Sequence, residues 1–194
     1  MQKSNNEDLN FLVERLIEYA NDEIKFFGET AKLLFLKNEF IINDTVDICV
    51  KRKNLTKVLK NIPNNYRIRY IDSEGNVSEK LRDTKFSQLT HLEVEIHGQR
   101  IMTIYVYDVH NKEWMFRFNH NIRLPEKHIY FHSLPWGVDY IKPEIVLMYE
   151  LLQPSVHHSG FNNKAVIDAL SYYQFVMLRV VVGEERLHDA LYAS

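Results

Sequence analysis

One short segment constrains the fold of this chain more than any other, because it joins two predicted strands through a glycine and a helix. Ile24 to Phe27 is an apolar run typical of a strand, and it ends at Gly28. Residues 29–38 have a helical pattern, and residues 45–50, rich in β-branched side chains, predict a second strand. Asp47 lies in that strand, nineteen residues after the glycine. The segment therefore predicts a strand–turn–helix–strand unit.

Such a unit is suited to binding a phosphate group. The first backbone N–H groups of a helix point outward with a partial positive charge, and a glycine there lets a phosphate approach them. An acid on the next strand can hold a cation that bridges the phosphate. Gly28 and Asp47 are therefore a candidate site, although a turn glycine and a surface aspartate would give the same pattern.

The remaining segments predict an α+β fold in two parts. An apolar stripe with helical spacing predicts a first helix, and it consists of Leu9, Leu12, Val13, Leu16, Ile17 and Ala20. A helix at 54–62, a strand at 66–72, a hairpin at 91–108 and strands at 114–118 and 128–132 follow, and then helices at 143–152, 164–181 and 184–192. We expect a mixed-sheet α/β domain at residues 1–134 and a C-terminal helical segment at residues 135–194 packed on it.

Composition excludes several classes of protein. The 194 residues carry 24 Lys+Arg and 26 Asp+Glu, a net charge of -2, which disfavours a general nucleic-acid binder. No apolar run approaches the roughly 20 residues that span a bilayer, and Met1 to Asp8 is too polar for a secretory signal. Cys49 is the only cysteine, which excludes intramolecular disulfides and cysteine-based zinc knuckles. We therefore expect a cytoplasmic protein, and the sequence indicates no oligomeric state.

The segment from Phe27 to Leu34, followed by Asp47, resembles the start of the nucleotidyltransferase fold in its aminoglycoside and lincosamide nucleotidyltransferase-like branch. Gly137 to Tyr149 is similar to the start of that family's first C-terminal helix. The spacing of Lys164 and Asp168, and residues 185–191, are similar to later family motifs. The resemblance covers roughly residues 24–60 and 135–191.

The resemblance implies an activity and a set of site residues. Members of this family use three carboxylates to bind two Mg²⁺ ions, and they transfer a nucleoside monophosphate from a nucleoside triphosphate to a hydroxyl group of a small-molecule acceptor. On this basis Asp47 would be the catalytic and metal-binding acid, and Glu29 a further metal ligand. Gly28, Glu29 and Lys51 would bind the nucleotide phosphates. Mg²⁺ would be the cofactor of an active member.

The sequence departs from the family pattern at three points. Thr45 and Thr103 stand where two of the three acids are expected, and Glu29 replaces the second small residue of the phosphate-binding turn. Asp44 would replace Thr45 only if a bulge turned it, because neighbouring strand residues face opposite sides.

The hairpin at 91–108 bears on the same question, because two glutamates lie on its first arm. If Gly98 and Gln99 form a two-residue turn, Val94 pairs with Thr103, and Glu93 and Glu95 face away from it. A register shift of one residue would be needed to bring either glutamate to that face.

These departures predict a divergent, catalytically impaired nucleotidyltransferase-like protein that keeps nucleotide or small-molecule binding. The alternatives are an active metal-dependent nucleotidyltransferase and an unrelated small binding domain.

Two further groups of residues are weaker candidates. The basic cluster of Lys51, Arg52, Lys53, Lys57 and Lys60 is typical of a solvated helix face, and alternatively of a phosphate contact. The pairs His157–His158 and His128–His132 are metal candidates by residue type, although scattered surface histidines are the more common explanation.

Overall fold

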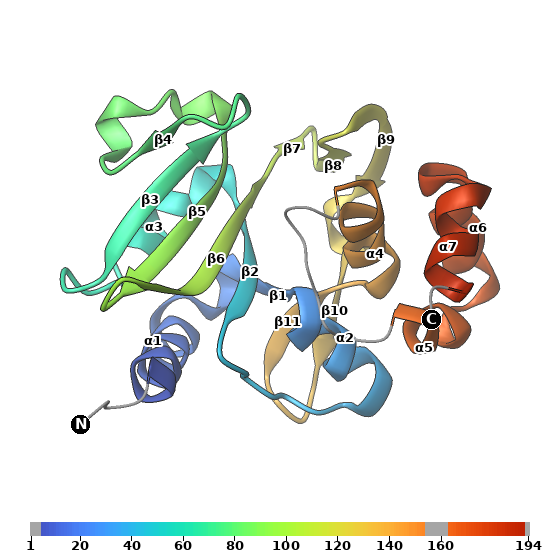
Figure 1. Cartoon of the computed structure of the whole chain (residues 1–194), viewed down its shortest axis with the longest axis horizontal. Coiled ribbons are helices and arrows are strands. Elements are labelled where there is room, and N and C mark those ends of the chain that lie inside the picture. The colour runs from blue at the N-terminus through green and yellow to red at the C-terminus, as the bar shows by residue number, and fades with distance from the viewer. Residues whose placement is uncertain (1–4, 154–162, 193–194) are drawn as a thin grey trace.

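The computed structural model describes residues 5–153 and 163–192, and within them the chain has the expected α+β organisation (Figure 1). The helices are α1 (Asn5–Ala20), α2 (Gly28–Lys37), α3 (Leu55–Leu59), α4 (Pro143–Leu152), α5 (Asn163–Ala169), α6 (Tyr172–Val182) and α7 (Glu184–Tyr192). The strands are β1 (Ile24–Phe27), β2 (Val46–Lys51), β3 (Arg67–Asp72), β4 (Val77–Ser78), β5 (Leu89–Ile96), β6 (Gln99–Tyr107), β7 (Val109–His110), β8 (Glu113–Phe116), β9 (Asn119–Pro125), β10 (Tyr130–Ser133) and β11 (Val138–Ile141).

An eight-stranded mixed sheet has the order β10-β11-β1-β2-β6-β5-β3-β4, and β7, β8 and β9 form a second, small sheet. β2 lies antiparallel to β1 and parallel to β6, and β6 forms a hairpin with β5. β2 is therefore a central strand, and both of its faces are covered. The predicted strand–turn–helix–strand unit corresponds to β1, α2 and β2.

One face of the sheet packs against α1 and α3. The predicted apolar stripe of α1 forms this core, with Leu12 and Leu16 almost fully buried beside Ile48 of β2 and Ile104 of β6. Because alternate strand residues share a face, Val46, Ile48 and Val50 all point to this side. Asp47 and Cys49 consequently point to the other.

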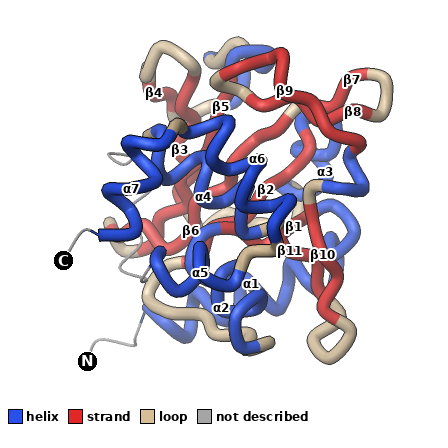
Figure 2. Tube along the Cα trace, turned by 90° about the vertical axis from the view of Figure 1, so that its right-hand side faces the viewer, coloured by secondary structure: helices blue, strands red, loops and turns tan. Residues whose placement is uncertain are grey.

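The opposite face packs against the C-terminal helices. Figure 2 shows α4, α6 and α7 in front of the sheet, and their apolar residues join Phe27 of β1 and Cys49 of β2 in a second core. Helix α4 begins at Pro143, the predicted first position. Its N-terminal Glu144 accepts a hydrogen bond from Gln174 of α6 at 2.6 Å, which ties the two helices together.

The C-terminal part differs from the prediction in two ways. β11 lies beside β1, so the sheet continues past residue 135 into the segment expected to be helical. The single helix predicted at 164–181 is two helices, α5 and α6, because Ser171 caps the N-terminus of α6 in a capping box with Gln174. Pro154, predicted to end α4, lies outside the described residues.

The predicted turn of the β5–β6 hairpin is wrong by one residue. His97 and Gly98 are the two turn residues, and both have a positive φ, of 52° and 78°, as a type I′ turn requires. A bulge on β6 leaves Ile101 unpaired, because Val94 pairs with Met102 and Glu95 pairs with Arg100. The hairpin register therefore differs from the expected one near Thr103.

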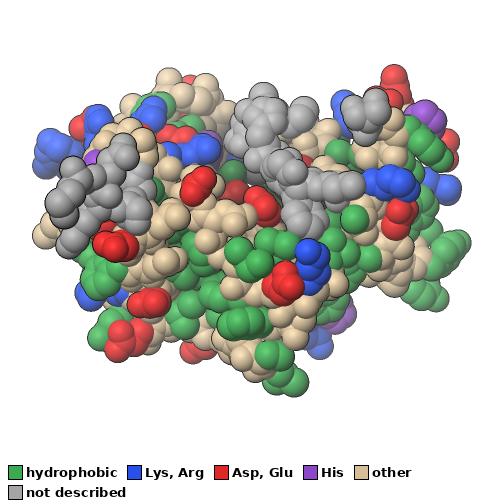
Figure 3. All heavy atoms as spheres, turned by 60° about the horizontal axis from the view of Figure 1, so that its bottom comes forward, with side chains coloured by type: hydrophobic (Ala, Val, Ile, Leu, Met, Phe, Trp, Pro, Cys, Tyr) green, Lys and Arg blue, Asp and Glu red, His purple; other side chains and the backbone are tan. Residues whose placement is uncertain are grey.

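The surface and the helices give two further observations. On the face drawn in Figure 3, acidic and basic side chains of the described residues are mixed with apolar ones, whereas a nucleic-acid surface would show one extended basic region. None of the helices in the described part of the chain is long and apolar enough to cross a membrane.

We predict that Ile48→Ala destabilises the protein by about 2–5 kcal/mol, because it removes a fully buried side chain from the central strand. Val77→Ala on β4, where the side chain is 51% exposed, should cost less than about 0.5 kcal/mol. Urea denaturation of both variants measures the difference. Equal losses would contradict the assignment of this core.

Candidate functional site

The N-terminus of α2 and the start of β2 meet at one point. Phe27 of β1 pairs with Asp47 of β2, and the chain then turns at Gly28 into α2 with a positive φ of 59°. A Cβ atom added to Gly28 would lie only 2.8 Å from Oδ2 of Asp47. The structure therefore brings the predicted glycine and the predicted acid into direct contact.

The two threonines that stand at expected acid positions differ in their place relative to the strands. Thr103 of β6 pairs directly with Asp47, and its hydroxyl hydrogen-bonds the Asp47 side chain. Thr45 and Asp44 precede β2, and both are exposed. Asp47 thus has a hydroxyl, and not a second carboxylate, as its neighbour across the sheet.

Glu93 lies on the same face as Thr103, which corrects the expectation that it faces away. A turn placed one residue earlier changes the paired positions by two, and alternation keeps the same residues on each face. The unpaired residue Ile101 moves the pairing back by one, so the net shift is one residue and Glu93 pairs with Thr103 in place of Val94. A row of paired residues therefore runs from Asp47 through Thr103 and Glu93 to Arg69 of β3.

The carboxylate of Glu93 is already compensated. It lies 3.1 Å from Nη1 of Arg69 and 3.4 Å from Nη1 of Arg100. Two strand spacings, about 10 Å, separate its backbone from that of Asp47. Glu93 is therefore not placed to share a metal ion with Asp47.

The other predicted site residues divide between the two ends of β2. Glu29 follows Gly28 and is close enough to raise the pKa of Asp47. The Glu29 carboxylate accepts a hydrogen bond of 2.9 Å from the side chain of Asn43. Lys51 lies four residues beyond Asp47, about 13 Å along the strand, and forms an ion pair with Glu126 at 2.5 Å. The structure thus brings Gly28, Glu29 and Asp47 together and places Lys51 apart, where its phosphate-binding role stays a prediction.

A buried ion pair lies behind the site, and sequence reasoning missed it. Lys32, one turn after Gly28 in α2, is fully buried, and its Nζ donates to Glu150 of α4 at 2.7 Å and to Asn163 of α5 at 2.8 Å. Burial lowers the pKa of Lys32 and raises that of Glu150. The sequence indicates this ion pair only through a lysine and a glutamate that stand among the apolar residues of two predicted helices.

Asp47 is half-buried, and this partial shielding from water changes the ionisation of its carboxyl group. Burial raises its pKa from the usual 3.8 to about 6, and Glu29 adds to the rise. The Thr103 hydroxyl, Arg100 and Lys32 act in the opposite direction.

The weaker candidates have local partners. Arg52 of the basic cluster binds the carboxylate of Asp108 through two nitrogens, at 2.6 and 2.8 Å, and Lys57 pairs with Glu23. Nδ1 of His132 lies 2.8 Å from Asp139. His157 and His158 lie outside the described residues. In residues 5–153 and 163–192, no three or more His, Cys, Asp or Glu side chains are grouped so as to hold a metal ion.

Comparison with known proteins identifies the fold. The chain is similar to ANT(2'')-Ia in the crystal structure with adenylyl-2''-tobramycin, with a TM-score of 0.59 and 10% identity over 91% of this chain and 97% of that one. The solution structure of the antibiotic-resistance factor ANT(2'')-Ia gives a TM-score of 0.52 and 10% identity, over 98% and 92% of the two chains. No family model and no curated protein sequence matches the chain. The predicted nucleotidyltransferase fold is therefore confirmed by structure.

We predict that Gly28→Ala is more destabilising than Gly75→Ala. Both glycines have a positive φ, so each alanine costs about 1–2 kcal/mol of backbone strain. Only at Gly28 does the added Cβ meet another group, Oδ2 of Asp47, whereas at Gly75 nothing lies within 4 Å. The clash should add about 1–3 kcal/mol in chemical denaturation. Equal losses would show that α2 does not approach Asp47 this closely.

We predict that Asp47 makes the protein less stable as the pH rises from about 4 to about 6.5. Since the folded-state pKa is raised, the folded protein binds the proton more tightly than the unfolded chain. The free energy of unfolding should therefore fall by about 3 kcal/mol over this range. Asp47→Asn should remove this component when the two pH profiles are subtracted.

Thr103→Val provides the matched check on the same profile. It removes a hydrogen bond that favours the ionised carboxylate, so the pH range of the effect should move upward. A downward movement, or a wild-type profile identical to that of Asp47→Asn, would contradict the burial of this carboxylate.

Proposed function

We propose that this protein is a catalytically impaired member of the nucleotidyltransferase fold that binds a nucleoside triphosphate or a similar small molecule at Gly28 and Asp47. The observation that carries the proposal is the composition of the row around Asp47. Thr103 is the hydrogen-bonded neighbour of this acid, and Thr45 lies exposed before the strand. One of the three expected acids is in place.

The phosphate-binding part of the proposal rests on α2. This helix has ten residues, and Phe27, which precedes it, gives no side-chain cap to its first N–H groups. Uncapped N–H groups at a helix N-terminus favour an anion, and these groups would be the backbone donors of the proposed site. The uncapped N–H groups of α2 therefore support binding of a triphosphate, although fewer carboxylates lie nearby than the family resemblance implies.

The side chains do not fit the two-magnesium site that the family resemblance implies. Two Mg²⁺ ions about 3.5–4 Å apart need bridging carboxylates on both sides. Here Asp47 is held by Thr103, Glu29 accepts from Asn43, and Glu93 is paired with arginines. We therefore propose binding without efficient catalysis.

An active enzyme is the alternative, and the proximity of Glu29 to Asp47 favours it. A single Mg²⁺ that arrives with a triphosphate needs only one or two protein carboxylates. Such an enzyme would transfer a nucleoside monophosphate to a hydroxyl of a small molecule. The adenylyl-2''-tobramycin bound to ANT(2'')-Ia is a product of this kind on the similar protein.

We predict that ATP with Mg²⁺ stabilises the protein against thermal unfolding without release of pyrophosphate. The gain should be about 2.7 kcal/mol at a hundredfold excess over the dissociation constant. Asp47→Asn should abolish the ATP-dependent shift, because the carboxylate of Asp47 would be the ligand for the Mg²⁺ that accompanies the triphosphate. A thermal scan with and without nucleotide measures both.

Asp44→Asn is the matched control, since it neutralises an exposed carboxylate three residues earlier and should keep the shift. No shift with ATP, GTP, CTP or UTP would overturn the proposed function. A shift that Asp47→Asn leaves unchanged would reject the site. Pyrophosphate release with Mg²⁺ or Mn²⁺ would support the active alternative.

A further inference from the structure

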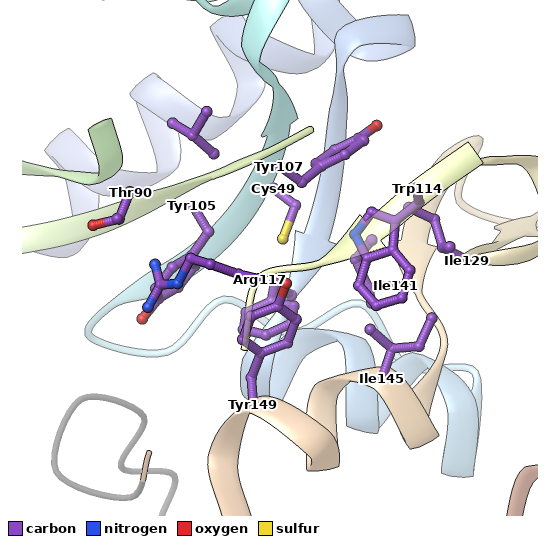
Figure 4. A pocket seen from close by; sticks show the side chains of 12 residues that line it. Cys49, Thr90, Tyr105, Tyr107, Trp114, Arg117, Ile129, Ile141, Ile145 and Tyr149 are labelled. Carbon is purple, nitrogen blue, oxygen red and sulfur yellow. The ribbon is translucent and has the colours of Figure 1, made fainter. Parts of the chain in front are cut away.

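A small cavity with a cationic side chain in its wall lies between the sheet and α4. Cys49, Tyr105, Trp114, Arg117 and Tyr149 are among its lining residues (Figure 4). Its volume of about 20 Å³ is room for one water-sized group. The remaining lining is apolar except for the hydroxyl groups of Thr90 and Tyr107, and Arg117 is the only charged side chain among the described residues of the wall.

Within the described part of the chain, Arg117 has no acidic partner. It lies in the turn between β8 and β9, and its Nη2 donates to Oε1 of Gln153 at 3.0 Å. Its Cζ also lies 4.9 Å from the centroid of the Phe118 ring. No carboxylate of the described residues lies within 4 Å of the guanidinium, whereas Arg52 and Arg69 both pair with acids. Among the described residues, the printed partners of its guanidinium are therefore an uncharged amide and an aromatic ring.

The groups around Arg117 are neutral at pH 7 and supply no counter-charge. Burial raises the pKa of the phenols of Tyr105 and Tyr149 far above neutrality. Burial and the charge of Arg117 together lower the pKa of His91 to about 4. Burial also lowers the pKa of Arg117, which is the expected result of removing an uncompensated cation from water.

Packing alone does not require this charge. A leucine or methionine would fill the same position beside Tyr149 without the cost of removing an ion from water. A partly buried guanidinium that faces a cavity and lacks a carboxylate is, however, a common way to bind an anion, because its planar fork matches two oxygens.

We propose that Arg117 binds an anionic group, a phosphate or a carboxylate, of a small-molecule ligand whose oxygen enters the cavity beside Tyr105. This site is distinct from the Gly28–Asp47 site and needs neither a metal ion nor the proposed function. The two are neighbours, since Tyr105 pairs with Cys49, two residues or about 7 Å along β2 from Asp47.

Thermal unfolding with inorganic phosphate or with acetate, in EDTA and at constant ionic strength, tests the proposal. At least one of these anions should raise the unfolding temperature of the wild type. Arg117→Leu should lose this increase, and Arg117→Lys should keep part of it because it keeps the charge. Comparing phosphate with acetate identifies which anionic group the site accepts.

Arg123→Leu is the matched control, because it removes an equal charge from the neighbouring strand at an exposed position. Its anion response should equal that of the wild type, and it measures any general salt effect. In the absence of anions, Arg117→Leu should unfold at the same temperature as the wild type or higher, which a purely structural arginine would not allow.

Two outcomes would overturn the proposal. In the first, the anions raise the unfolding temperature of the wild type no more than that of Arg117→Leu. In the second, Arg123→Leu loses as much of the anion-dependent increase as Arg117→Leu does. Asp47→Asn should keep the phosphate or acetate response. Since the proposed function is tested by nucleotide with Mg²⁺ and by Asp47, failure of one proposal leaves the other standing.

Discussion

The close approach of the α2 backbone to the Asp47 carboxylate is the constraint on which the rest of the site depends. It requires β1 and β2 to lie antiparallel with Phe27 opposite Asp47, and it requires the chain to turn at once with a positive φ. A residue with a Cβ would meet both backbone strain and the carboxylate, so glycine satisfies two conditions at Gly28. The same contact places the carboxylate of Asp47 beside the uncapped N-terminus of α2.

The charges around this contact are balanced by the protein itself. Thr103 donates to Asp47, Lys32 and Arg100 favour its ionised form from a greater distance, and Glu150 neutralises Lys32. A set of three clustered carboxylates would need bound cations to offset their mutual repulsion. Thr103, the residue that pairs with Asp47 on β6, adds no negative charge, so this contact does not have that requirement.

Much of the fold was predictable because its signals are local. The apolar stripe of α1 and the glycine before α2 follow from patterns within a few residues, whereas Thr103 became a site candidate only through the family resemblance. Glu93 was misplaced because alternation is equally regular in either register, and neither the His97–Gly98 turn nor the bulge at Ile101 leaves a distinctive pattern. The Lys32–Glu150 pair joins residues 118 positions apart, and no local pattern encodes such a contact.

The small number of carboxylates near Asp47 and the cationic wall of the cavity at Arg117 are physically related. In a site rich in carboxylates, a nearby guanidinium would be held by one of them, as Arg69 is held by Glu93. Next to Asp47 the sheet presents Thr103 and then Tyr105, neither of which is negative at neutral pH. Under the proposed assignment, the guanidinium therefore keeps hydrogen-bonding capacity toward the cavity, and this part of the sheet face accepts an anion directly.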